Sequence, residues 1–365
     1  MNICIIGDGL TSLSLAKNLI NKKINVHIYH ENKIQNSSQS RTIGVSSNNL
    51  KYFNKEIYKL SKKNTWQIKE IEIYSEKQKN NKILHFEKNK DNLFYIIKNN
   101  EIYKSLRIEL SKNKFFKKIK INKKNFYKDL LEKNKYDLII NCDPYNILST
   151  KFFNKKFDKD YFNLAYTTTL EHKKIENTSA IQIFTKFGPI AFLPISKTQT
   201  SVVCSLEVKN KKYNENEVLS LINKHNPKFQ IKKILKLNNF KLKSSNLRNY
   251  FYKNILAFGD MLHRVHPLAG QGFNMTIRDI RILSKIIQDK IDLGIQLDSF
   301  ILEEFEKKTK HNNFIFSNGI DVIYETFNID KQTNDNSFNS ILKFLGKNKK
   351  LKNSIIKFAD EGINT

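Results

Sequence analysis

A glycine-rich turn between two apolar segments lies at the start of the chain. Residues 3–6, ICII, read as a short buried strand, GDGLTS as a turn, LSLAKNLINKK as a helix, and INVHIYH (residues 24–30) as a second strand. Gly7 permits the tight turn, and Gly9 lets the backbone approach a pyrophosphate at the helix N-terminus. Ser12 stands where a third glycine is usual and is small enough for close packing. This β-α-β order predicts a Rossmann-like dinucleotide-binding domain, and by itself it leaves FAD and NAD equally open, with an ordinary α/β turn as the alternative.

The second strand ends at a histidine followed by a glutamate. A carboxylate at this place can accept hydrogen bonds from both hydroxyls of the adenosine ribose. Counting from the first glycine puts His30 at the usual position and Glu31 one residue beyond. We therefore expect Glu31 to hold the ribose, with His30 in a partial role.

The excess of basic residues raises the question of nucleic-acid binding. The 365 residues include 64 Lys and Arg against 35 Asp and Glu, a formal net charge of +29. Clustered cations neutralise phosphates, but here the charge comes mostly from lysine and accompanies abundant Asn, Ile, Phe and Tyr, as an AT-rich coding sequence produces. We expect a solvated basic surface and no nucleic-acid partner, and weak attraction to anionic membranes stays open.

The cysteines and the chain start indicate the compartment. Cys4, Cys142 and Cys204 lie far apart in apolar runs, without metal-ligand spacing, so we expect small core residues, no metal site and a reducing environment. The sequence opens directly with the strand MNICIIG, which leaves no room for a leader peptide. No apolar run approaches the roughly 18 residues that span a bilayer. A cytoplasmic protein is expected, with a peripheral membrane contact as the alternative.

The residue pattern changes twice along the chain. YDLIINCD (residues 136–143) is another buried strand, whereas residues 161–209 alternate over longer runs that are typical of antiparallel sheet. NILAFGD (residues 254–260) returns to a buried strand, and the chain is mostly helical from residue 273. The pattern predicts an α/β fold of two domains, Rossmann-like and antiparallel-sheet, with C-terminal helices. The expected boundaries are 1–70, 96–155 and 245–330 for the dinucleotide-binding domain, 71–95 and 156–244 for the inserted sheet domain, and 331–365 for the C-terminal helical segment.

A long stretch late in the chain carries a specific resemblance. FGDMLHRVHPLAGQGFNMTIRDI, residues 258–280, contains Gly-Asp, His-x-x-His-Pro, Ala-Gly-Gln-Gly-Phe-Asn and Arg-Asp in one register. It resembles the second FAD motif of the aromatic flavin hydroxylases related to p-hydroxybenzoate hydroxylase, and in particular of their ubiquinone-biosynthesis branch. SRTIGVS (40–46), IIKNNEIYKSL (96–106) and AIQIFTKFGPIAFLPIS (180–196) are similar to further segments of that family, in the same order.

The resemblance implies FAD as the cofactor. Asp260 is expected to accept hydrogen bonds from the ribityl hydroxyls, and the helix that begins near Phe273 is expected to point its N-terminus at the flavin ring. Arg41 is expected to lie against the flavin, and Asn99 to open a helix with cofactor contacts. The expected FAD contacts are Gly7, Gly9, Ser12, Glu31, Arg41, Asn99, Asp143, Gly259, Asp260, Pro267, Gly270, Gln271, Gly272, Phe273 and Asn274.

The sequence departs from the family pattern at two places. Asn100 stands where an arginine is usual. The family's Gly-Ala-Asp-Gly is here NCDP, residues 141–144, which retains Asp143 and loses both glycines. In that family the second segment helps to hold FAD and is linked to the nicotinamide donor, so the resemblance implies that the departure bears on reduction of the flavin.

Two histidines in the long motif invite a catalytic or metal-binding interpretation. A proline and glycines surround His263 and His266, which favours a loop over a helix, and no third ligand is apparent. We expect hydrogen-bonding residues near FAD, with structural pairing for Arg278 and Asp279. The sequence identifies no catalytic base, and His266 and Pro267 are the candidates nearest the flavin.

The activity that the resemblance implies is hydroxylation of the aromatic ring of a polyprenylated phenol in ubiquinone biosynthesis. NADPH or NADH is the implied transient reductant and O2 the co-substrate. The implied partners are the phenol, a quinone-biosynthesis complex and the inner membrane, which the basic amphipathic segment 338–362 could contact, although packing of this segment against the body is the default. A catalytically silent FAD-binding scaffold and a hydroxylase of another aromatic substrate are the alternatives.

Overall fold

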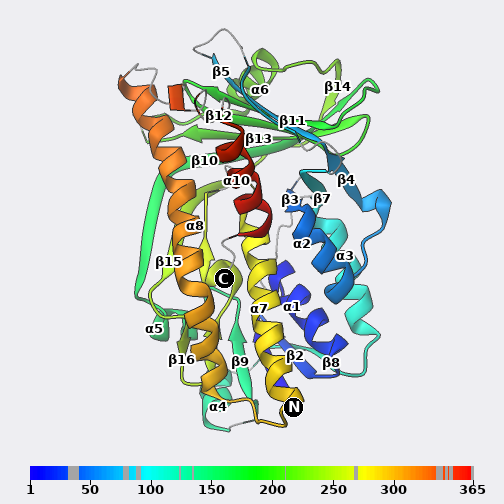
Figure 1. Cartoon of the computed structure of the whole chain (residues 1–365), viewed down its shortest axis with the longest axis vertical. Coiled ribbons are helices and arrows are strands. Elements are labelled where there is room, and N and C mark those ends of the chain that lie inside the picture. The colour runs from blue at the N-terminus through cyan, green and yellow to red at the C-terminus, as the bar shows by residue number, and fades with distance from the viewer. Residues whose placement is uncertain are drawn as a thin grey trace.

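A six-stranded sheet forms one layer of the fold in the computed structural model (Figure 1). β1 (Asn2–Ile6) lies between β2 and β9, and the pairings β1–β2, β1–β9, β2–β8 and β9–β17 are all parallel. The other strands are β2 (Asn25–His30), β8 (Phe116–Lys120), β9 (Leu138–Asn141), β16 (Phe251–Tyr252) and β17 (Ile255–Ala257). The structure describes residues 1–31, 41–76, 82–87, 92–122, 125–133, 135–209, 211–266, 270–333, 340–341, 344 and 348–362.

The parallel sheet is apolar because helices cover it on both faces. One row across it runs Ile28, Ile5, Ile140 and Leu256, each fully buried. The covering helices include α1 (Leu10–Asn21), α3 (Asn99–Ser111) and α7 (Gly272–Asp292), and both α3 and α7 contact α1. Shorter helices in this part are α4 (Phe126–Glu132) and α5 (Ile147–Phe152).

A nine-stranded, largely antiparallel sheet forms the second layer, at the top of Figure 1. Its longest strand, β10 (Lys156–His172), pairs with β13 on one side and with β15 on the other. The remaining strands are β5 (Glu70–Ser75), β6 (Lys82–Glu87), β11 (Ser179–Thr185), β12 (Gly188–Pro194), β13 (Gln199–Glu207), β14 (Ile231–Ile234), β15 (Asn238–Leu247) and β18 (His263–Arg264). Helix α6 (Glu215–Lys224) packs on this sheet and begins with a capping box of Asn214 and Glu217.

A small third sheet lies between the two layers. It contains β3 (Thr42–Ser46), β7 (Phe94–Lys98) and β4 (Thr65–Ile68) in the order β3-β7-β4. β3 leads directly into α2 (Ser47–Tyr52), which one wider turn, Phe53–Ile57, extends. A single turn, Lys62–Asn64, precedes β4.

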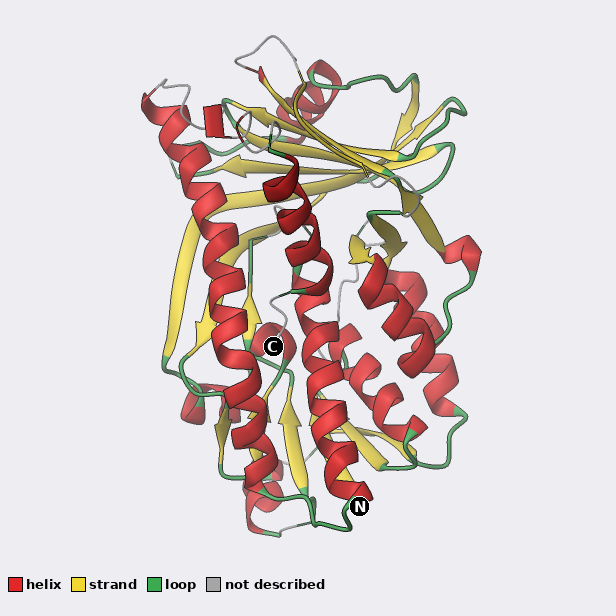
Figure 2. Cartoon of the chain, in the orientation of Figure 1, coloured by secondary structure: helices red, strands yellow, loops and turns green. Residues whose placement is uncertain are grey.

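Two C-terminal helices join the layers (Figures 1 and 2). α8 (Ser299–Thr333) runs along the whole length of the molecule. α10 (Lys349–Glu361) packs back on the body, because Phe358 stacks on Phe316 of α8 at 4.8 Å and Ile356 joins an apolar cluster with Phe86 of β6. The body-packing expectation for the C-terminal segment is thus confirmed for α10, while Phe338, Leu342 and Leu345 lie outside the described residues.

The α/β class with an antiparallel sheet is confirmed, and each strand that the sequence predicts is present. The sequence pattern identified no individual strand at β3, β4, β5, β6, β7, β8, β14, β15, β16 or β18. β18 belongs to the nine-stranded sheet through Ser245 and Arg264, although it follows β17 of the parallel sheet closely. The exact domain boundaries stay a prediction.

Candidate functional site

Four parallel strands end at the same edge of the six-stranded sheet. β1, β2, β9 and β17 end at Ile6, His30, Asn141 and Ala257. In open α/β sheets this carboxyl edge is where ligands bind. The residues that follow these ends are Gly7, Glu31, Asp143, Gly259 and Asp260, so the structure brings together five of the residues that the sequence assigns to FAD.

The two glycines at this edge hold conformations that other residues rarely adopt. Gly7 has φ of +103°, and a Cβ there would lie 3.4 Å from the backbone nitrogen of Asp143. Gly259 has φ of +65°, and a Cβ there would lie 2.5 Å from Cγ2 of Thr11 on α1. Both positions therefore require glycine, since it alone combines a positive φ with so close an approach.

The first turn of α1 is open to an anion. The N-cap residue is Gly9, no side chain caps the helix, and no acidic residue lies in its first turn. Unpaired N–H groups and the helix dipole favour a phosphate there. Ser12 is fully buried against the sheet, consistent with the expected packing role.

Glu31 is held by a residue that the sequence did not single out. The hydroxyl of Tyr127, on α4, donates to Oε1 of Glu31 at 3.0 Å. Burial, followed by the hydrogen bond to Glu31 and then the charge of Glu31, raises the pKa of Tyr127, so the phenol stays a donor. Tyr127 thereby fixes the carboxylate at the end of β2.

A side-chain network holds the turn that lacks the family's glycines. Asn141 Nδ2 donates to Ser149 Oγ at 2.9 Å, and Asn146 Nδ2 donates to Asn141 Oδ1 at 2.7 Å. The Ser149 hydroxyl donates to the carbonyl of Asp143 at 2.6 Å. The turn thus keeps Asp143 beside Gly7 without either glycine. The only sequence signal for the network was an Asn at a strand end and another at a helix start.

Asp143 and Asp260 lie near the same thiol, that of the partly buried Cys142. Burial raises the pKa of Cys142 to about 12, and the negative charges of Asp260 and Asp143 add to this shift. Burial likewise raises the pKa values of Cys4 and Cys204, which supports their expected role as core residues.

The segment that carries Arg41 is clamped to the start of α7. Asn274 Oδ1 accepts from the N–H of Ser46 at 2.9 Å and from Asn49 Nδ2 at 3.1 Å, and Asn274 Nδ2 donates to the carbonyl of Gly44 at 2.9 Å. The side chain of Asn274 is thus engaged by protein, so a contact of this residue with FAD would come from its backbone. The N–H of Asn99 donates to the carbonyl of Arg41 at 3.0 Å, which joins two further predicted site residues.

The N-terminus of α7 has the form that the sequence predicts. The helix begins at Gly272 with Gln271 as N-cap, and neither a capping side chain nor a first-turn acidic residue is present. Gly270 approaches Gly44 of β3, and the ring of Phe273 lies 6.2 Å from that of Phe53. Pro267 lies outside the described residues.

The same region contacts the antiparallel sheet. Thr42 Oγ1 donates to Ser201 Oγ of β13 at 3.0 Å, and Lys98 Nζ donates to Gln199 Oε1 at 3.2 Å. Residues 258–262 lead from the carboxyl edge into β18 of the nine-stranded sheet. The carboxyl edge therefore opens toward that sheet.

The two histidines of the long motif are buried in separate places. His263 Nε2 lies 2.5 Å from Asp279 Oδ2, and Asn313 Nδ2 donates to the other oxygen of Asp279 at 3.2 Å. His266 lies between the rings of Tyr161 and Tyr324, with centroids at 4.7 and 4.3 Å. Burial lowers the pKa of His266 to about 3, so its ring is neutral.

Arg278 and Asp279 do have structural roles, although with different partners. Asp279 pairs with His263, whereas the guanidinium of Arg278 lies over the ring of Phe316 at 4.5 Å. Burial lowers the pKa of Arg278 to about 10.

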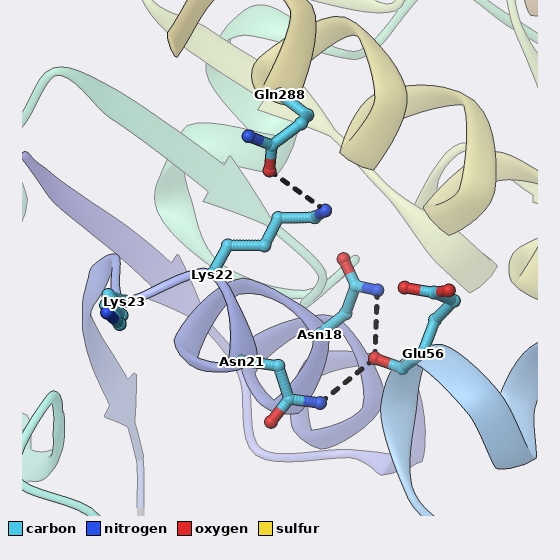
Figure 3. A pocket seen from close by; sticks show the side chains of 6 residues that line it. All are labelled: Asn18, Asn21, Lys22, Lys23, Glu56 and Gln288. Atoms are coloured by element: carbon cyan, nitrogen blue, oxygen red, sulfur yellow. Dashed lines mark hydrogen bonds between the residues drawn. The ribbon is translucent and has the colours of Figure 1, made fainter. Parts of the chain in front are cut away.

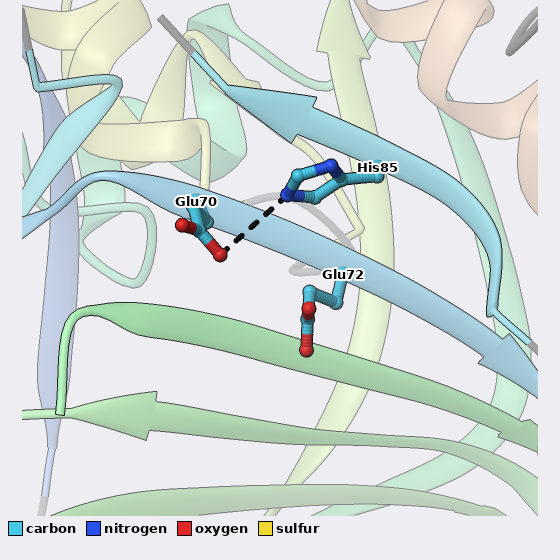
Figure 4. A group of neighbouring side chains, drawn as sticks. All are labelled: Glu70, Glu72 and His85. Carbon is cyan, nitrogen blue, oxygen red and sulfur yellow. Dashed lines mark ion pairs between the residues drawn. The ribbon is translucent and has the colours of Figure 1, made fainter. Parts of the chain in front are cut away.

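Two other polar groupings are separate from this edge. The pocket in Figure 3 is lined by Asn18, Asn21, Lys22, Lys23, Glu56 and Gln288, which places it at the opposite end of α1 from the glycine turn. In Figure 4, Glu70, Glu72 and His85 bring three potential metal-ligand atoms within 4.8 Å of one another. Lys82 Nζ lies 2.5 Å from Glu72 Oε1, so a lysine of the chain already neutralises the Glu72 carboxylate.

The residues of the carboxyl edge fit a flavin dinucleotide. The glycine cradle and the open first turn of α1 suit a diphosphate. Two buried oxygens, Oε1 of Gln271 at the start of α7 and Oδ1 of Asn100 at the start of α3, have no hydrogen-bond partner within the described part of the chain. Buried polar atoms are normally satisfied, so these two are suited to donors of a bound group.

Comparison with known proteins gives the same cofactor. A family model described as an FAD binding domain matches residues 154–292. The ubiquinone biosynthesis monooxygenase COQ6 of Dictyostelium discoideum is 24% identical, over 94% of this chain and 87% of that protein. The 3-demethoxyubiquinol 3-hydroxylase of Escherichia coli (strain K12) is 29% identical, over 41% of this chain and 40% of that enzyme.

Solved structures share the fold. The p-nitrophenol 4-monooxygenase PnpA of Pseudomonas putida DLL-E4 superposes with a TM-score of 0.76 at 11% identity, covering 100% of this chain and 98% of that one. PqsL of Pseudomonas aeruginosa, described as a probable FAD-dependent monooxygenase, gives 0.70 at 13% identity over 94% and 99%. The chain therefore carries an FAD binding domain, and it is similar in sequence to ubiquinone-biosynthesis hydroxylases and in fold to FAD-dependent monooxygenases.

Proposed function

We propose that the protein hydroxylates the aromatic ring of a polyprenylated phenol in ubiquinone biosynthesis, with NADPH or NADH and O2. The observation that carries this proposal is the meeting of the carboxyl edge with the antiparallel sheet at the Arg41 segment, through Thr42 and Ser201. A cofactor held at Gly7, Asp260 and the start of α7 would face that sheet. The names of the relatives from Dictyostelium and E. coli supply the substrate class.

Bound FAD would supply the redox and oxygen chemistry, and the chain would hold it and keep the reaction dry. Gly7 and the first turn of α1 would bind the diphosphate, and Glu31 would bind the adenosine ribose. Leu193 of β12 and Ile195, just after that strand, pack in an apolar cluster with Ile96 and Trp66 of the small sheet. This surface is suited to an aromatic ring with an apolar tail.

The departure from the family pattern at residues 141–144 leaves the proposed cofactor site intact. The network of Asn141, Asn146 and Ser149 holds that turn with Asp143 beside Gly7, in place of the missing glycines. A scaffold that binds FAD would need the same turn, so the arrangement supports cofactor binding, and formation of a hydroxylated product distinguishes the enzyme from the scaffold.

A complementation panel tests the proposed activity. The gene is expressed in strains that each lack one ubiquinone ring hydroxylase, and the quinone intermediates are identified by mass spectrometry. We expect one strain to recover its missing hydroxylated product. FAD-loaded protein in every strain with no such product would refute the proposed activity and favour the scaffold.

We also propose a peripheral contact with the inner membrane, where a quinone-biosynthesis complex would receive the lipid-like product. None of the described helices is long and apolar enough to cross a bilayer. Ile341, Phe344, Leu351 and Ile355 are exposed apolar residues in a lysine-rich segment, which suits an anionic lipid surface. Flotation with anionic vesicles should carry the wild type but not the F344S/L351S variant, and equal flotation of both would contradict the contact.

A further inference from the structure

A carboxylate lies inside the turn that is suited to a diphosphate. Asp8 separates Gly7 from Gly9, and its side chain is 21% exposed. A negative charge at this place opposes an anion, because two like charges repel strongly where the environment is only partly solvated. The turn therefore requires a compensating cation if it is to bind a nucleotide.

The cation comes from the outermost strand of the parallel sheet. Lys118 Nζ lies 2.9 Å from Asp8 Oδ2, and its side chain is 24% exposed. Lys118 lies opposite Ile28 in the β2–β8 register, so the pair reaches across β2. His30 Nδ1, at the end of β2, lies 4.0 Å from the same oxygen.

The other basic residues of β8 are placed differently. Successive residues of a strand point to opposite faces, and Lys117, next to Lys118, is exposed and paired in register with His27. Lys118 is partly buried and directed at the glycine turn. Lys120 shares the face of Lys118 and lies opposite His30, but it is exposed, whereas the ion pair with Asp8 is made by Lys118.

A second partner of Asp8 lies on α3. Burial raises the pKa of Tyr103, and the negative charge of Asp8 contributes next. The guanidinium of Arg107 lies 5.7 Å from the Tyr103 ring. Asp8 thus connects the turn, β8 and α3, and Lys118 is the cation in direct contact with it.

We propose that Lys118 is a positioning residue of the FAD site, which neutralises Asp8 so that the glycine turn accepts the diphosphate. The inference rests on the proposed function in one respect, the binding of FAD at this edge. The proposal predicts two opposite changes in FAD affinity. Loss of the lysine charge should weaken FAD binding, and loss of the Asp8 charge should strengthen it.

The test is a titration of apoprotein with FAD, followed by the change in flavin fluorescence. We expect K118M to raise the Kd about five- to tenfold, as for a partly screened charge near an anion, and D8N to lower it by a similar factor. The double variant D8N/K118M should return to the wild-type Kd. K118R, which keeps the charge, should bind nearly as the wild type.

K117M is the matched control, because it removes the same charge from the neighbouring residue on the other face of β8. Its Kd should stay close to that of the wild type. Equal effects of K117M and K118M would show a general charge effect and overturn the inference, as would a double variant that binds no better than K118M. If K118M does not fold, D8N alone decides, since a Kd that is unchanged or raised contradicts the proposal.

The outcome is separable from that of the proposed function. A wild-type apoprotein that binds no FAD would refute the cofactor site itself. Wild-type binding with no change in any of the variants would refute only the role of Lys118.

Discussion

The imidazole of His263 and the carboxylate of Asp279 form a buried pair, 2.5 Å from Nε2 to Oδ2, with side chains 1% and 2% exposed. His263 belongs to β18 and Asp279 to α7, and Asn313 of α8 donates to the second carboxylate oxygen. The pair therefore joins the nine-stranded sheet to the two long helices behind the proposed flavin site.

Removal of one partner should destabilise the fold strongly. H263A leaves the Asp279 carboxylate without its main partner in an environment that excludes water, and breaking a buried pair in this way lowers the free energy of unfolding by about 3–5 kcal/mol. Urea denaturation followed by circular dichroism measures the loss. The control is H311A, which changes an exposed histidine of α8 and should alter stability by less than about 0.5 kcal/mol. Similar losses in both variants would contradict the structural role of the pair.

Tyr127 should matter for FAD affinity through Glu31. Y127F removes the hydrogen bond to a carboxylate that we expect to bind the ribose. Such bonds are worth about 1.5–3 kcal/mol, so the Kd should rise by a factor between about 10 and 150. Flavin fluorescence titration of the apoprotein gives the value. Y136F is the control, because the Tyr136 hydroxyl bonds only Tyr29 and His27 among the described residues. In a background that already carries E31Q, Y127F should have little further effect, and a full additional loss would argue against this coupling.

Asn274 should stabilise the junction of β3 and α7. N274L leaves the N–H of Ser46 and the carbonyl of Gly44 unpaired in a buried place, at about 1–3 kcal/mol each. Urea unfolding should show a loss of several kcal/mol. N274D can still accept from Ser46 and Asn49 but cannot donate to Gly44, so its loss should be smaller than that of N274L. A larger loss of stability in N274D than in N274L would show that the hydrogen bonds accepted by the Asn274 amide do not stabilise this junction.

His266 should make the fold less stable in mild acid. Its folded pKa of about 3 lies below the ordinary value of 6.5, so the unfolded chain binds the proton more readily. Stability from this group is complete above pH 6.5 and falls as the pH drops toward 3, by up to about 1.4 kcal/mol per pH unit. H266F keeps an aromatic ring between Tyr161 and Tyr324 but has no group that titrates there. Between pH 7 and pH 5 the free energy of unfolding of the wild type should therefore decrease by about 2 kcal/mol more than that of H266F. Parallel pH profiles of the two proteins would refute the shift.

The sequence predicted the elements of the fold better than the contacts between them. ICII and YDLIIN are continuous apolar runs, and such runs at Ile3 and Leu138 are typical of parallel strands buried on both faces. β8 and β15 went unpredicted because each has few apolar residues: FKKIK in β8 has two and NNFKLKSSNL in β15 has three. The short β18 carried no pattern at all, since its position depends on its pairing with Ser245.

The candidate site could be predicted where a backbone conformation requires one residue type. Gly7 and Gly259 are of this kind, because their positive φ angles and close contacts exclude other residues. Tyr127 and Lys118 could not be found in the same way. Each acts on a residue far away in the chain, Glu31 or Asp8, and one sequence contains no signal for such a pairing.

The short connection between β17 and β18 couples the positions of the two sheets. Residues 258–262 alone separate the parallel sheet from the antiparallel one, and Gly259 and Asp260 lie within them. A ligand that displaces the antiparallel sheet would therefore pull directly on the residues proposed to hold the ribityl chain. Substrate binding at the antiparallel sheet would therefore change the affinity for FAD through the five residues 258–262, without a hinge or a moving lid.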